Sequence, residues 1–366
     1  MKNLCIYILL LMAVCASSVW HVLGKLALTH RMDASGFLVC RMSLSACVLL
    51  LFGKFIAKID FVKPRPEQVP RILFVGACTF LHSFCFVYGL QMTTPFLCAV
   101  MQPSVPVLVW LLSLTIGVER ASLRKAIGVV LCSIGAVGAA AASSHHASTG
   151  NDPMEGTDFE TGTVLIILQC ILYACHLVFQ QPLLQALPPV QVTSMMYGIA
   201  GMITAFVTLL RTILVALLPV IAPQSTTTVS APYWALSTDP TAWFALAFCV
   251  IFASAFTHGI YSWASKRVAP TTVSVFITVE PITTTIVSLA ITQSGMPNLT
   301  EAIFAAIVAV GVILVLRGGS GNDHPDISHS YEPVSRADIP DMELQEFSLE
   351  QFPSPKHKRK SFPSSE

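Results

Sequence analysis

One stretch of the chain, residues 89–137, has a weaker second copy 175 residues later. Pro95 in the first copy matches Pro270 in the second, and Pro106 matches Pro281. A nearly constant offset over so long a span indicates an internal duplication. Duplication inside a hydrophobic chain is typical of a membrane transporter, so this feature limits the possible folds more than any other.

The composition indicates that the chain lies in a membrane. Of its residues, 54% are hydrophobic and only 11% are charged, with a mean hydropathy of +0.69, whereas about 25% of the residues in a soluble domain are charged. The segment 318–366 holds 14 of the 41 charged residues, so the rest is poorer still. We therefore expect an integral membrane protein surrounded by lipid, and the net charge of +1 gives no reason to expect a nucleic-acid partner.

Ten apolar segments are long enough to cross a membrane as helices. They are residues 3–24, 35–53, 71–90, 95–117, 123–142, 162–181, 192–219, 241–264, 268–293 and 300–317. This predicts an all-α membrane fold of ten transmembrane helices in two halves of five. The expected domains are a first repeat at 1–142, an outer polar loop at 143–161, a second repeat at 162–317 and a disordered cytosolic tail at 318–366.

The first span has an alternative interpretation as a signal peptide. It begins with Lys2 and an apolar run, and a sequence resembling a cleavage site ends at Ser17. The apolar run continues beyond that site, and the repeat requires this helix. We therefore interpret it as a membrane span.

The basic residues between the spans indicate their orientation. If the N-terminus is cytosolic, the cytosolic loops carry most of the lysines and arginines, and the opposite loops carry mostly acids. The positive-inside rule then places both termini in the cytosol. Because five is odd, the second half enters the membrane upside down, so the repeat is predicted to be inverted. The plasma membrane and an endomembrane both remain open as the location.

Four histidines lie within predicted spans, where polar residues are costly and need an explanation. His21 and His176 occupy the first and sixth spans, and His82 and His258 occupy the third and eighth. Each pair therefore lies in corresponding helices of the two halves. Inversion predicts His21 and His82 in the outer half of the membrane, and His176 and His258 in the inner half.

The neighbours of these histidines follow helical spacing. Tyr173, His176 and Gln180 share one face of the sixth span, and His258 and Tyr261 share one face of the eighth. Such single polar stripes are typical of the walls of a substrate cavity. The alternative is hydrogen bonding between helices without any role in transport. Histidine titrates near neutral pH, so binding of a coupling proton is a further hypothesis.

Charged residues inside the spans complete the candidate set. Glu280 is the only acid deep in a span, and its neighbour Pro281 frees a backbone carbonyl one turn back. We interpret Glu280 either as a proton or substrate site or as a structural hydrogen-bonding residue. Arg41 and Arg211 are interpreted as snorkelling toward the outer surface. No two of the histidines are close on one helix, so we expect no metal site.

Several segments resemble the EamA-like branch of the drug/metabolite transporter superfamily over about residues 4–317. The resemblance is carried by 20–25, Arg41, 89–90, 93–106, 117–120, 128–135, 267–270 and 280–281. It implies an inverted ten-helix fold with a central cavity that includes the four histidines and Glu280. The segment 293–295 departs from the family, which usually has a Gly-Glu turn there. The resemblance implies substrates as different as amino acids, nucleobases, auxin-like compounds, sugars and drugs.

We therefore expect a secondary-active transporter of a small organic solute that works by alternating access, with proton coupling as a hypothesis. Its path would be lined by His21, His82, His176, His258, Glu280, Tyr173, Gln180 and Tyr261. The alternatives are a nucleotide-sugar antiporter of the endomembrane system and a non-transporting receptor or scaffold. No phosphate-binding loop or catalytic motif is present, so we expect neither an enzyme nor a cofactor. A homodimer is left open.

Overall fold

The computed structural model describes most of the chain before residue 318. The described residues are 2–29, 33–116, scattered positions between 123 and 138, 156–221, 239–268, 270–292 and 299–317. They belong to one compact unit, Met1–Pro325, and every regular element among them is helical. The expected tail at 318–366, and residues 143–155 of the expected outer loop, lie outside the described residues.

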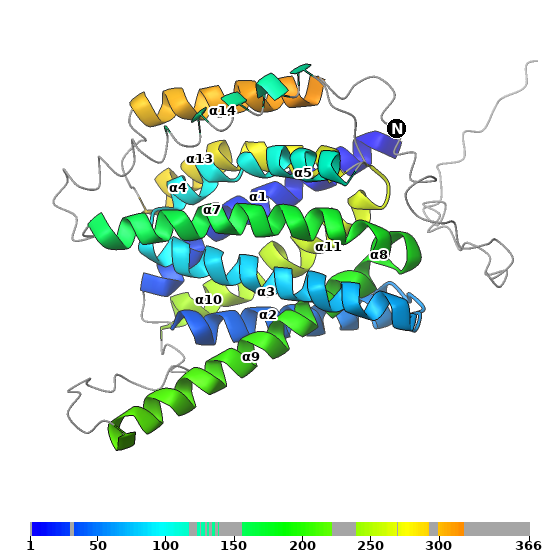
Figure 1. Cartoon of the computed structure of the whole chain (residues 1–366), viewed down its shortest axis with the longest axis vertical. Coiled ribbons are helices and arrows are strands. Elements are labelled where there is room, and N and C mark those ends of the chain that lie inside the picture. Colours follow the sequence, from blue (N-terminus) through cyan, green and yellow to red (C-terminus); the bar gives the residue numbers. More distant parts are fainter. Residues whose placement is uncertain are drawn as a thin grey trace, which may run out of the picture. The chain divides into compact units, whose positions relative to one another are not determined.

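The helices follow the predicted spans closely (Figure 1). They are α1 (Lys2–Thr29), α2 (Ala34–Leu51), α3 (Val69–Met92), α4 (Pro95–Met101), α5 (Ser104–Thr115), α7 (Gly156–Phe179), α8 (Gln181–Ala186), α9 (Pro189–Ile221), α10 (Pro240–Phe248), α11 (Thr257–Ser265), α12 (Pro270–Val275), α13 (Glu280–Thr292) and α14 (Leu299–Arg317). Helix α7 begins at Gly156, inside the segment expected to be loop. A π-helical turn, Phe52–Ile56, extends α2.

Seven stretches of the described chain are apolar and long enough to cross a membrane. They are Cys5–Leu28, Ala34–Ile56, Pro66–Met92, Pro95–Thr115, Phe159–Ala186, Pro189–Leu214 and Pro240–Ser265. The chain is thus an integral, multi-pass membrane protein. Of the other three predicted spans, 123–142 is largely outside the described residues, 268–293 is broken into shorter helices, and 300–317 corresponds to α14.

Short polar side chains fix where some of these helices begin. Asp33 Oδ2 accepts hydrogen bonds from the backbone N–H groups of Ser35 (2.9 Å) and Gly36 (3.0 Å) at the start of α2. Asp239 Oδ1 accepts one from the N–H of Thr241 (2.8 Å) at the start of α10. The first N–H groups of a helix have no partner inside it, so these carboxylates satisfy them.

Three of the predicted spans are interrupted near their middle. Helices α4 and α5 are separated at Gln102–Pro103, as the prolines of this segment predict. A 3-10 helix, Phe276–Val279, separates α12 from α13, and it lies 175 residues after that first break. A π-helical segment, Cys249–Phe256, separates α10 from α11. Such irregular turns free backbone groups and redirect side chains, and they are frequent at functional sites.

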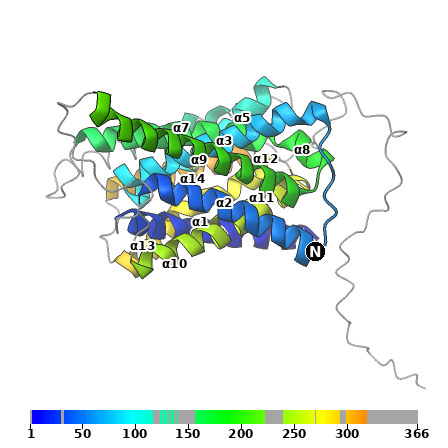
Figure 2. The same ribbon diagram turned by 90° about the horizontal axis from the view of Figure 1, so that it is seen from below.

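The contacts between the helices fall into two matching sets, and the helices involved can be followed in Figures 1 and 2. Helix α3 packs along α7, α1 packs along the run from α10 to α11, and α2 packs along α9. Helix α1 also packs against α13, as α5 does against α7. These contacts map onto one another when α1 is exchanged with α7, α2 with α9, α3 with α10–α11, and α4–α5 with α12–α13.

Glycines let two of the helix pairs approach closely. A Cβ added at Gly162 in α7 would lie 2.7 Å from Met92 Cβ, at the end of α3. A Cβ at Gly135 would lie 2.6 Å from Val308 of α14, and a Cβ at Gly138 would overlap the ring of Phe304. Without a hydrophobic driving force between helices in lipid, such close approach supplies the packing contacts.

The substitution Gly162→Ala is expected to lower the melting temperature of the purified protein in detergent. Its new methyl group would overlap the Cβ of Met92, which no rotamer change can move, and overpacking typically destabilises by about 1–3 kcal/mol. Gly198→Ala in α9 is the control, because its nearest neighbour would lie at 4.0 Å. Equal melting temperatures for the two variants would contradict the close packing of α3 and α7.

Candidate functional site

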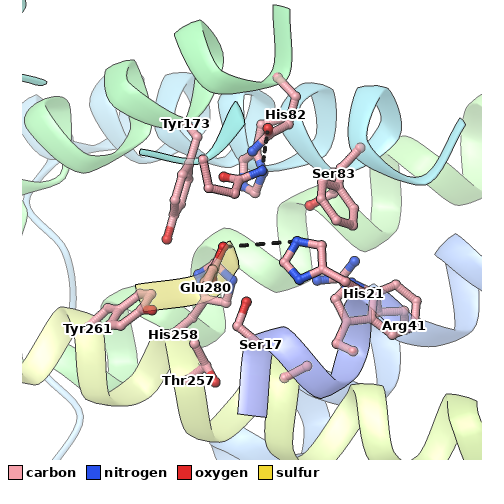
Figure 3. A pocket seen from close by; sticks show the side chains of 15 residues that line it. Ser17, His21, Arg41, His82, Ser83, Tyr173, Thr257, His258, Tyr261 and Glu280 are labelled. Atoms are coloured by element: carbon pink, nitrogen blue, oxygen red, sulfur yellow. Dashed lines mark hydrogen bonds and ion pairs between the residues drawn. The ribbon is translucent and has the colours of Figure 1, made fainter. Parts of the chain in front are cut away.

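A cavity of about 50 Å³ lies among α1, α2, α3, α7, α11 and α13 (Figure 3). Its lining residues are Ser17, Trp20, His21, Arg41, His82, Ser83, Phe86, Gln102, Gln169, Tyr173, Ala253, Thr257, His258, Tyr261 and Glu280. All three helix interruptions contribute to this lining or lie directly beside residues that do. Gln102 lies in the first break, Ala253 lies in the π-helical segment, and Glu280 follows the 3-10 helix.

His21 and Glu280 approach each other across the cavity. His21 Nε2 lies 4.0 Å from Glu280 Oε2, and both side chains are buried. In the described part of the chain this is the one acid–base pair within 4.0 Å that joins the two halves. An ionised carboxylate away from water is stable only when it is paired. The imidazole of His21 can form this pair, because it can share a proton with the carboxylate of Glu280.

The other three histidines form a cluster with Tyr173. The ring centroid of His82 lies 5.5 Å from that of His176 and 6.3 Å from that of His258. The Tyr173 ring lies 5.0 Å from His82. The sequence paired the histidines by repeat. The structure instead groups His82 with the two histidines of the second half.

Two residues of the predicted path do not line the cavity. His176 lies behind it, where its Nδ1 makes a 3.0 Å hydrogen bond with Thr79 Oγ1 of α3. Gln180 is buried at the start of α8, outside the lining. The lining does include the other predicted residues, which are His21, His82, Tyr173, His258, Tyr261 and Glu280.

Arg41 is the lining residue whose position the sequence interpretation got wrong. It was expected to snorkel toward the outer surface, but its side chain is 5% exposed and lines the cavity. Its Nε donates a hydrogen bond to Ser254 Oγ at 3.0 Å, and its guanidinium lies 5.0 Å from the ring of Trp20. Arg41 is the eighth residue of α2, about 11 Å along the helix at 1.5 Å per residue. The position of Arg41 this far along α2 already argued against a side chain that snorkels to the outer surface.

The cavity gathers buried polar atoms that have no hydrogen-bond partner within the described part of the protein. They are Trp20 Nε1, His21 Nδ1, Arg41 Nη1, His82 Nε2, Ser83 Oγ and Tyr261 OH. In folded proteins more than about 90% of buried polar groups are hydrogen-bonded. The convergence of so many free polar atoms on one small space is typical of a site that receives a polar solute or water.

Sequence reasoning missed Gln102 at the cavity wall, whereas its partner Gln169 lies on the polar face of the sixth span, four residues before Tyr173. Gln102 Nε2 donates to Gln169 Oε1 at 3.1 Å, which joins the break between α4 and α5 to α7. Ser83 and Phe86 were missed as well, although they lie one and four residues after His82 on α3. Phe86 lies one helical turn after His82 and shares its face, so that spacing could have identified it, whereas Ser83 lies on a different face and could not be found in this way.

Other candidate sites are less suited to chemistry. In the described residues no group of histidines, cysteines and acids could hold a metal ion. A larger hollow of about 320 Å³ lies among α2, α3 and α9, and apolar and aromatic side chains form much of its lining. There Arg211 donates to Ser35 Oγ (3.1 Å) and Tyr88 OH (3.3 Å). The central cavity is therefore the candidate functional site.

Comparison with known proteins gives a consistent result. The model of the EamA-like transporter family matches residues 4–141 and 160–317. The chain is 25% identical over 334 residues to the Protein WALLS ARE THIN 1 of Arabidopsis thaliana, which covers 82% of this chain and 79% of that protein. A protein crystal structure matches with a TM-score of 0.57 at 15% identity, over 85% of this chain and 97% of that one. This last likeness concerns the fold alone.

Thr79→Val is expected to destabilise the protein more than Thr204→Val does. Both hydroxyls are buried and donate to the carbonyl four residues back, but within the described residues only Thr79 also makes a hydrogen bond to a second helix, at His176. Leaving a buried imidazole nitrogen without its partner costs about 1–3 kcal/mol. Thermal unfolding in detergent measures the difference. Equal losses of melting temperature would show that the Thr79–His176 bond does not stabilise the fold.

Proposed function

Because the chain belongs to the EamA-like transporter family, whose members carry small solutes across membranes, we propose that it is a secondary transporter working by alternating access. The observation that carries the proposal is the central cavity, where buried polar atoms without protein partners converge from both halves of the chain. A solute of small size and mixed polarity would satisfy those atoms. Uptake of a panel of labelled solutes into proteoliposomes is the test, and no uptake of any of them above empty liposomes would contradict it.

The proposed architecture is ten spans in two inverted repeats, at 1–142 and 162–317, joined by the segment 143–161 and followed by a cytosolic tail at 318–366. Three observations support it. The family match falls into two ranges, the helix contacts map onto one another when the halves are exchanged, and the breaks in the fourth and ninth predicted spans lie 175 residues apart. Discontinuous helices at the repeat interface are typical of secondary transporters.

Alternating access follows from the size of the cavity and from the helix breaks. At about 50 Å³ the cavity holds only a few atoms, so a larger solute needs the halves to separate on one side. The breaks beside Gln102 and Glu280 supply positions where the helices can bend. The distribution of basic residues supports cytosolic termini, in either the plasma membrane or an endomembrane.

Proton coupling is proposed for the pair His21 and Glu280. A carboxyl group that alternates between a neutral form and a form paired with imidazole can carry one proton per cycle. The titratable or charged groups that share the cavity with this pair are Arg41 on α2, His82 on α3, Tyr173 on α7, and His258 and Tyr261 on α11. The coupling therefore depends on the charge of the whole cavity.

The charges of the cavity do not suit a nucleotide-sugar antiporter. A diphosphate needs several cations, and Arg41 is the single lysine or arginine in the described lining. Lys25 is engaged elsewhere, because its Nζ donates to the carbonyls of Leu90 (3.1 Å), Gln91 (2.7 Å) and Thr93 (2.7 Å) at the end of α3. A receptor or scaffold would require no such cavity. A transporter of small solutes therefore accounts best for the site.

Glu280→Gln is expected to remove the stimulation of uptake by an imposed pH gradient while leaving uptake down the solute's own gradient. Glutamine keeps the size and polarity of the side chain but has no carboxyl proton to release. The measurement is uptake of the best solute of the panel into proteoliposomes, with and without the gradient. Glu67→Gln is the control, because Glu67 is exposed and lies outside the cavity. Gradient-driven uptake that is the same in Glu280→Gln and in wild type would exclude Glu280 as the coupling site.

A further inference from the structure

We propose that the central cavity binds small organic anions, in particular monocarboxylates, and that Arg41 is the residue that receives the carboxylate. This inference rests on the transport function proposed above and names the substrate class of that site. It comes from one feature of the cavity: a permanently charged side chain lies buried with part of its hydrogen-bonding capacity unused.

The guanidinium of Arg41 is held in place by neutral groups. Its Nε donates to Ser254 Oγ at 3.0 Å, and the ring of Trp20 lies 5.0 Å from Cζ. Trp20 in turn stacks on Phe37, with ring centroids 5.2 Å apart and planes 8° apart. These contacts orient the guanidinium but do not neutralise it, because neither Ser254 nor Trp20 carries a charge.

No carboxylate in the described part of the chain lies within 4.0 Å of this guanidinium. The one acid of the cavity, Glu280, approaches His21 instead. Arg41 Nη1 is buried and has no hydrogen-bond partner within the described protein. Arginine stays protonated in proteins, and a buried charge is stable only when it is paired. The unused donor therefore marks where an anion would bind.

The surroundings of Arg41 favour one carboxylate over a larger or more highly charged anion. Trp20 beside Arg41 has an unpartnered N–H, and Ser83 of the same lining has an unpartnered hydroxyl, so the cavity offers further donors to an anion. Planar guanidinium matches the two oxygens of a carboxylate. A second negative charge would find no lysine or arginine besides Arg41 among the described lining residues, and Glu280 would repel it when ionised.

The test uses two series of probes in which only the charge changes. Acetate, acetamide and acetamidinium have the same shape, and so do benzoate, benzamide and benzamidinium. Each probe is titrated into the purified protein at constant ionic strength, and its affinity is obtained from the rise in melting temperature with concentration. In at least one series we expect the carboxylate to bind about tenfold more tightly than the amide, and the amidinium more weakly than both.

Variants at Arg41 identify the residue responsible. Arg41→Gln is expected to bring the carboxylate-to-amide ratio close to one. Arg211→Gln, which removes an arginine outside the cavity, is expected to leave the ratio unchanged. Arg41→Lys keeps the charge without the planar fork, so it is expected to retain only part of the preference, and it serves if Arg41→Gln does not fold.

Three results would overturn the proposal. They are an amide or amidinium that binds as tightly as its carboxylate in both series, a carboxylate preference that survives in Arg41→Gln, and no binding of any probe by the wild type. The uptake panel separates this failure from failure of the transport function. Uptake of neutral or cationic solutes without anion binding would contradict the proposed substrate class but would support the transport function. Anion binding through Arg41 without any uptake would support the anion site but would contradict the transport function.

Discussion

The cost of burying charge away from water governs the centre of this protein. Arg41 and Glu280 lie in the interior of a chain that otherwise presents apolar surfaces, and each needs partners that lipid does not offer. The helices therefore surround them with hydroxyls, imidazoles and amides, and these groups together form the cavity. Histidine suits this environment because it pairs with a carboxylate and can also remain neutral.

The interruptions of the helices follow from the same constraint. Backbone groups freed at a break need partners, and in a membrane they find them only inside protein or beside a polar cavity. The breaks beside Gln102, Thr257 and Glu280 all occur at the cavity. Proline at the first break explains its position, whereas the π-helical segment contains no proline.

The sequence predicted the helices and much of the cavity lining because both depend on local patterns. Apolar length defines a span, and polar residues at helical spacing define a wall, so Tyr173, His258 and Tyr261 could be assigned from spacing alone. Arg41 could not, because a side chain long enough to snorkel can equally turn inward, and only the positions of Trp20 and Ser254 decide. The grouping of the histidines also depends on how helices from different halves cross.

The central polar interactions share one property: each joins the first half of the chain to the second. His21 meets Glu280, His82 meets the histidines of the second half, Gln102 bonds Gln169, and Arg41 bonds Ser254. Thr257 likewise donates to the carbonyl of Ala13 at 3.1 Å. Movement of one half against the other must therefore break hydrogen bonds in a region without lipid partners for them. In the proposed transport cycle, a solute or a proton that replaces these bonds would lower the barrier to that movement, and this would couple occupancy of the cavity to the exchange of its accessible side.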